Sequence, residues 1–106
     1  MAGAVANFAA ERLIRRAPDH PLALGEDDQA YLLACLRDIE RVFAIDAVFG
    51  VPLAVLPGRT VMRHLVTLHQ TLRPQDAEQR TTAGRLVGAI LLLDTACALD
   101  HDLKRG

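Results

Sequence analysis

The stretch GRLVGAILLLDTACAL, residues 84–99, decides the fold of this chain. Arg85 and Asp94 are its only charged residues, and it contains no proline. Apolar and polar residues do not alternate in it with the period of two that a half-buried strand shows, so the stretch predicts a helix. No other segment of the chain alternates in that way over the length of a strand. The predicted fold class is therefore all-α.

Proline and glycine divide the chain into four helical segments. The residue before a proline disfavours the helical conformation, so Pro18 and Pro21 end the first segment. The region from Gly50 to Gly58 ends the second, and Pro74 is placed to begin the fourth. The predicted helices are 3–16, 26–49, 60–72 and 74–102. A chain of 106 residues that is 51% hydrophobic is expected to be one domain, residues 1–106, folded as a compact bundle.

Two apolar stripes run along the predicted helix 74–102. One contains Ala83, Val87, Ile90 and Cys97, and a second lies on the opposite side. A helix that is apolar on all sides is buried on all sides, so this helix is expected to lie at the centre of the bundle or between two copies of the chain. We assign the second stripe to a homodimer contact. The expected contact residues are Gly88, Ala89, Leu92, Ala96 and Leu99.

Residues 47–75 contain no carboxylate, although the chain has 13 Asp and Glu against 12 Lys and Arg. With Thr60 as N-cap, the apolar residues of helix 60–72 share one face, and Arg, Thr, Gln and His occupy the other. The uncharged run VPLAVLPG, residues 51–58, precedes this helix. We expect a protein with an acidic surface to bind here. The expected contact residues are Arg59, Arg63, His64, Thr67, Gln70, Leu53 and Leu56.

Direct DNA binding is the first alternative. The sequences FGVP and GRTVMRHL, residues 49–52 and 58–65, together resemble a helix-turn-helix. The resemblance implies that helix 60–72 would read the major groove, in a transcriptional regulator. The net charge of −1 argues against nucleic acid, because phosphate contacts dominate such affinity.

Ribonuclease activity is the second alternative. Arg59 and His64 are spaced as R-x4-H, which is similar to the motif of HEPN-domain ribonucleases, also small all-α domains. The resemblance implies that this Arg and His would act together on an RNA phosphodiester. The chain has no serine, no glycine-rich phosphate loop and no paired carboxylates beside a histidine. We expect no enzymatic activity and no cofactor.

Asp94, Cys97 and His101 share one face of helix 74–102 and are ligand types for a transition metal. No second ligand pair accompanies them, so we expect no metal site. Cys35 and Cys97 are expected to be buried, unpaired thiols, as in a reducing cytosol. The longest apolar run, LVGAILLL at residues 86–93, is too short to span a bilayer. The sequence therefore predicts a cytoplasmic homodimer without membrane contact, in a regulatory or adaptor role.

Overall fold

The computed structural model describes the backbone of residues 2–105 and the side chains of residues 9–103. The prediction of an all-α fold with about four helices is confirmed. The elements in chain order are α1 (Ala2–Arg16), α2 (Glu26–Phe43), the short 3-10 helix η1 (Leu53–Val55), α3 (Gly58–Thr71) and α4 (Ala77–Arg105).

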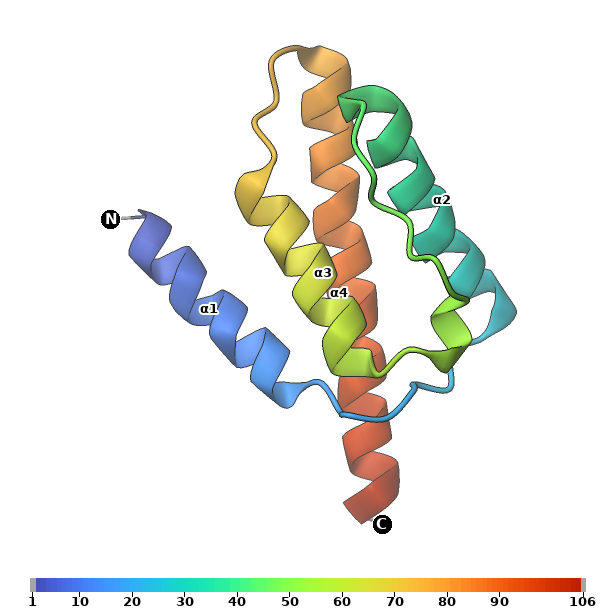
Figure 1. Cartoon of the computed structure of the whole chain (residues 1–106). Helices are drawn as coiled ribbons and strands as arrows, with labels where there is room; N and C mark the ends of the chain where they lie inside the picture. Colours follow the sequence, from blue (N-terminus) through green and yellow to red (C-terminus); the bar gives the residue numbers. More distant parts are fainter. Residues whose placement is uncertain (1, 106) are drawn as a thin grey trace.

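The other helices are assembled on α4. α2 and α3 both pack along it and run antiparallel to it, and α1 lies beside α3 (Figure 1). The molecule measures 46 × 34 × 19 Å, so its smallest dimension is about two helix diameters. It is a plate of two helical layers, with α3 in front of α4 in the view of Figure 1.

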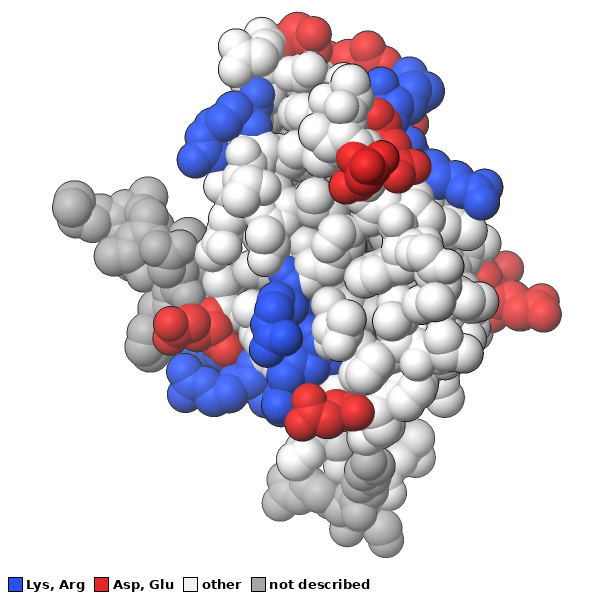
Figure 2. All heavy atoms as spheres, viewed as in Figure 1, with Lys and Arg blue, Asp and Glu red and all other residues white. Residues whose placement is uncertain are grey.

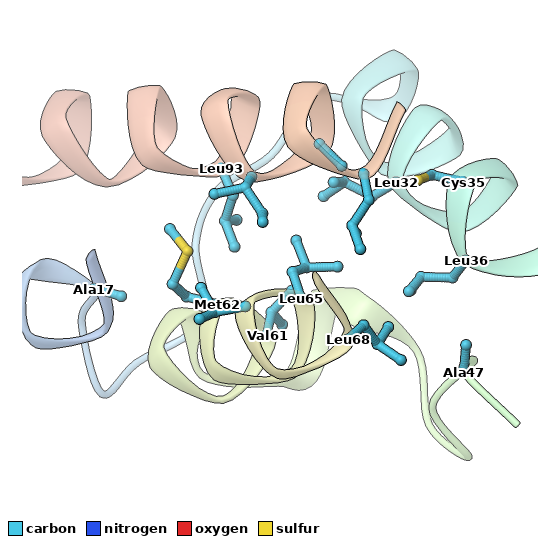
Figure 3. Close-up of a cluster of buried hydrophobic side chains, with 14 of the residues drawn as sticks. Ala17, Leu32, Cys35, Leu36, Ala47, Val61, Met62, Leu65, Leu68 and Leu93 are labelled. Atoms are coloured by element: carbon cyan, nitrogen blue, oxygen red, sulfur yellow. The ribbon is translucent and has the colours of Figure 1, made fainter. Parts of the chain in front are cut away.

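The core lies where α2, α3 and α4 meet. Leu65 of α3 lies between Leu93 of α4 and the buried face of α2, which carries Leu32 and Leu36, and Met62 lies below Leu93 on the side nearer Ala17 (Figure 3). Each of these six side chains is at most 1% exposed. Cys35 and Cys97 are also buried here and are unpaired, as predicted from the sequence.

One side of α4 faces this core, and it differs from both stripes expected from the sequence. Val87 is 40% exposed and Leu91 is 60% exposed, whereas Ala89 is fully buried inside the chain. Apolar residues surround the helix almost completely, so the sequence pattern alone does not show which side of α4 faces the core. The buried residues of α4 are Thr82, Leu86, Ala89, Ile90, Leu93 and Cys97.

By length and composition, α4 could cross a membrane. Its segment Ala77–Leu103 has a mean hydropathy of 1.5 over the best window. The sequence-based prediction rested only on the uninterrupted apolar run of residues 86–93, which is too short to span a bilayer. The core helix of a bundle passes the same test, and α4 packs against both α2 and α3.

α2 ends at Phe43, six residues before the predicted boundary at residue 49. Ala44 adopts the left-handed conformation, with φ 55°. The Glu40 carboxylate then accepts hydrogen bonds from the N–H groups of Ala47 and Val48, at 3.0 and 3.1 Å. The chain therefore turns back toward α3 where the sequence pattern had predicted more helix.

α3 begins at Gly58 instead of residue 60, and Thr60 is not its N-cap. The N–H of Gly58 donates to the His20 carbonyl at 2.9 Å, and the N–H of Arg59 donates to the Pro18 carbonyl at 2.8 Å. These bonds satisfy N–H groups that a helix start leaves without partners. The linker between α1 and α2 therefore replaces a capping side chain.

α4 begins at Ala77 instead of Pro74. The Asp76 carboxylate accepts the N–H of Gln79 at 2.8 Å, as an N-cap side chain does. A proline fits the first helical position, but an aspartate that caps the helix two residues later determines the observed start.

Gly58 gives a test of the contact between the linker and α3. A Cβ at this position would lie 2.9 Å from Leu22 Cδ1 and 3.0 Å from Pro18 Cδ. We expect Gly58→Ala to lower the free energy of unfolding by about 1–3 kcal/mol, because the crowded side chains must shift. Gly50→Ala is the control, since nothing lies within 4 Å of its Cβ position. Equal urea midpoints for the two variants would contradict the packing described for Gly58.

Candidate partner-binding surface

Arg63, Thr67 and Gln70 lie on the outer face of α3 and are exposed, as the sequence predicted for this side of the helix. Figure 2 shows the molecule from this side: Lys and Arg gather near the lower part of α3, beside a wide area without charged side chains. This area covers much of α3 and the segment that connects α2 to α3. We call the outer face of α3 together with residues 47–57 the front face; the exposed carboxylate of Asp46 lies at its border.

Arg59 is not directed outward with these residues, because its side chain reaches back to the end of α1. Nε donates to the carbonyls of Ile14 and Ala17 at 3.2 and 3.0 Å, and one terminal nitrogen donates to the Arg15 carbonyl at 3.2 Å. The other terminal nitrogen pairs with Asp19 at 2.9 Å. The last carbonyls of a helix have no partners within it, so Arg59 caps α1 from a different part of the chain.

His64 also turns inward, on the side of α3 next to the connecting segment. Its Nε2 is hydrogen-bonded to the Ala47 carbonyl, and its ring packs against Phe49 with 4.5 Å between ring centroids. Arg59 and His64 therefore contact different parts of the chain on different sides of α3. The structure does not bring them together as a joint ribonuclease site would require.

The segment of residues 47–57 is apolar and is held at both ends. Residues 47–58, AVFGVPLAVLPG, contain no polar side chain, yet Val51 is 49% exposed and Val55 is 60% exposed. Glu40 holds its beginning, and a bridge between Pro21 and Pro57 holds its end. The hydrogen bonds from Ala47 and Val48 keep the pKa of Glu40 below its usual value, so this carboxylate is ionised at neutral pH.

A groove of about 370 Å³ lies between α2 and this segment. Leu33 of α2 lines it on one side, and Val51 and Leu53 line it on the other. Arg37 lies at the edge of the groove and is exposed, and its charge is near enough to Glu40 to contribute to the lowered pKa of that carboxylate. Leu53 and Leu56, both expected to contact a partner, are partly buried against the core. The full lining is Gln29, Ala30, Leu33, Leu36, Arg37, Val48, Phe49, Gly50, Val51, Pro52 and Leu53.

The basic side chains near the start of α3 are largely neutralised within the chain. Three pairs account for this: Arg15 with Glu11 at 3.6 Å, Arg16 with Asp94 at 2.7 Å and Arg59 with Asp19 at 2.9 Å. A phosphate backbone requires several free cations along one surface. The helix-turn-helix resemblance also lacks its short turn, since residues 44–57 separate α2 from α3.

Asp94, Cys97 and His101 do not form a common site. Asp94 binds Arg16, whereas Cys97 is buried, and burial raises its pKa to about 11. No group of three or more His, Cys, Asp or Glu residues able to hold a metal ion occurs among the residues that the structure describes.

The sequence had marked Leu53 and Leu56 but not the more exposed valines beside them, nor Arg37. Val51 and Val55 lie within the uncharged run and could have been selected on that basis. No sequence signal pointed to Arg37, because its position beside the groove depends on how residues 48–53 fold against α2. Comparison with known proteins adds nothing to this geometry, because no protein-family model, curated protein or solved structure matches the chain.

Arg59 and Arg63 form a matched pair for a stability test. We expect Arg59→Ala to lower the free energy of unfolding by about 1–3 kcal/mol, because it leaves the carbonyls at the end of α1 without a donor. We expect Arg63→Ala to change it by no more than about 0.5 kcal/mol, since Arg63 is exposed. Urea unfolding followed by circular dichroism measures both. Equal effects of the two substitutions would show that Arg59 does not cap α1.

Proposed function

We propose that this chain is a small, non-enzymatic regulatory or adaptor protein of the cytoplasm that works as a homodimer and binds another protein through its front face. The observation that carries the proposal is the segment of residues 47–58. It is uncharged and partly exposed, and the fold holds it at both ends. An exposed apolar surface of this kind is typical of a protein-binding site. A segment that is already ordered loses little conformational entropy on binding.

The chemistry of the front face indicates the kind of partner. The groove beside α2 accepts apolar side chains, while Arg37 at its edge and Arg63 on α3 are exposed cations. A partner segment with aliphatic side chains flanked by carboxylates complements this arrangement. The carboxylates would guide association and register, and the apolar groups would supply most of the affinity.

The positions of Arg59 and His64 support a binding role over catalysis. Both side chains make structural contacts inside the chain, with the end of α1 and with Ala47. A general base or a phosphate-binding arginine must reach the substrate instead. RNA cleavage by the purified protein that disappears in His64→Ala would contradict the non-enzymatic part of the proposal.

Val55 provides the sharpest test, because its side chain is 60% exposed and a substitution there should leave the fold intact. The bait would be purified wild type or Val55→Asp, applied to a nuclease-treated extract of the source organism. We expect wild type to retain a specific protein, and Val55→Asp to bind the purified partner at least tenfold more weakly, because a carboxylate is introduced into an apolar contact. Leu103→Asp is the control, since Leu103 is 81% exposed on the far end of α4.

A second arm of this experiment separates protein from DNA. Arg63→Glu should weaken binding to an acidic protein, with a modest dependence on salt. Binding that nuclease treatment abolishes, or whose logarithm falls steeply and linearly with the logarithm of salt concentration, would instead identify DNA. Equal binding by wild type and Val55→Asp would rule out the front face.

A further inference from the structure

The outer side of α4 carries a stripe of exposed residues that is mainly apolar or small between its charged ends. One edge of this stripe borders α1 and α3, since Val87 and Leu91 line a groove with Leu13 and Val66, and Ala98 and Asp102 line another with Arg15 and Arg16. The residues of the stripe are spaced by 4, 3, 4, 4, 3 and 4 positions, which keeps them on one side of a helix. Val87 is 40% exposed and Leu91 is 60% exposed, and the remaining members are exposed as well. The stripe is Arg80, Gly84, Val87, Leu91, Thr95, Ala98 and Asp102.

This stripe reads the same way from both ends. When two copies of a helix pack antiparallel about a two-fold axis at Leu91, position 91+n of one copy meets position 91−n of the other. Leu91 then meets Leu91 of the second copy. Gly84 of one copy meets Ala98 of the other, and both residues are small. Val87 meets Thr95, and these two side chains have nearly the same shape. Arg80 and Asp102, of opposite charge, meet at the two ends.

The charged residues of α4 differ in whether they form ion pairs within one chain. Arg85 binds Asp38 at 2.9 Å, and Asp94 binds Arg16 at 2.7 Å. Arg80 and Asp102 have no ion-pair partner among the side chains of residues 9–103. Among the described side chains of α4, these two charges at the ends of the stripe are available to pair between copies.

The polar member of the stripe can be buried without losing a hydrogen bond. The Thr95 hydroxyl donates to the Leu91 carbonyl of its own helix at 3.0 Å. A buried hydroxyl is costly only when it has no partner. Thr95 therefore presents its methyl group to a second copy as Val87 presents one of its own.

Of the two glycines of α4, only Gly84 supports a contact on this side of the helix. A Cβ at Gly88 would lie 3.0 Å from the Tyr31 hydroxyl, so packing within one chain accounts for Gly88. Nothing lies within 4 Å of a Cβ at Gly84, although glycine costs about 1 kcal/mol relative to alanine in a helix interior. Close approach of a second helix gives Gly84 the packing role that it lacks in one chain.

We infer that two copies of this chain associate through the outer face of α4, antiparallel about Leu91, with Arg80 of each copy paired with Asp102 of the other. This inference rests on the homodimer part of the proposed function and moves its contact from the Leu92 stripe to the Leu91 stripe. α3 packs on the core side of α4 (Figure 1), and its Gln70 lines a groove together with Leu91, so the front face and the dimer face adjoin along one edge. The segment of residues 47–57 lies outside the proposed α4 contact, so each copy of the dimer keeps it available for a partner.

Leu91 and Leu99 form a matched pair for the first test, because they lie on the same helix and are both 60% exposed. Sedimentation of wild type at micromolar concentration should show a dimer. Leu91→Arg should yield a folded monomer by sedimentation and circular dichroism, since two arginines would meet at the axis. Leu99→Arg should change the dimer dissociation constant by less than about threefold. If Leu99→Arg dissociates the dimer and Leu91→Arg does not, the Leu91 register is wrong, although the chain is still a homodimer.

Charge reversal tests the register independently of any loss of apolar contact. Arg80→Glu and Asp102→Arg should each weaken the dimer about tenfold or more at low salt, because each places like charges together at two symmetric positions. The double variant should return to within about threefold of wild type. Arg63→Glu on the front face is the control and should leave dimerisation unchanged. Absence of rescue in the double variant would overturn the register.

A monomeric wild type would overturn both this inference and the homodimer part of the proposed function, but not partner binding by the front face. Wild type that stays monomeric and sediments with vesicles of neutral phospholipid would assign the face to a lipid surface. That result would also overturn the inference.

Discussion

The requirement to cover α4 is the constraint on which the rest of the structure depends. This helix is apolar on nearly every side, while a two-layer plate can bury only one side of it. Leu86 and Leu93 face the shared core with α2 and α3, and Leu91 on the opposite side remains exposed. The fold of one chain thus satisfies half of the requirement, and the proposed dimer satisfies the other half.

A second constraint comes from the short contacts that hold the front of the plate together. Arg59 joins the end of α1 to the start of α3, because its side chain binds the carbonyls of α1 and its N–H binds the linker at Pro18. Glu40 and His64 hold Ala47 from opposite directions, through its N–H and its carbonyl. Charged and polar residues of the central sequence therefore serve to position an apolar segment on the surface.

The fold class and the core face of α3 could be predicted from the sequence, because the spacing of Val61, Leu65 and Leu68 identifies a buried stripe by itself. The roles of Arg59 and His64 could not. Their acceptors belong to residues that lie near them only after the chain has folded, such as Ile14 and Ala47. The end of α2 depends in the same way on the carboxylate of Glu40, which a helical pattern does not distinguish from any other surface charge.

The rotation of α4 illustrates the limit of periodicity. When apolar residues surround a helix, a helical wheel supports several core faces, and the neighbouring helices determine which one is used. Exposed fractions in the structure identify the core side and thereby the outer stripe around Leu91. The proposed dimer brings two such stripes together in antiparallel contact.

Distances between spin labels in the dimer test this antiparallel contact most directly. Labels would be attached to single introduced cysteines at Ala77 and Leu99, which are exposed on α4 and lie outside the proposed contact stripe. Cys35 and Cys97 are buried, and burial raises the pKa of both thiols, so they react more slowly with a labelling reagent than an introduced exposed cysteine does. An antiparallel pair centred on Leu91 predicts axial separations of about 42 Å for labels at Ala77 and about 24 Å for labels at Leu99. Equal separations of about 10 Å at both positions would indicate parallel helices, and the absence of any coupling between labels would contradict the contact itself.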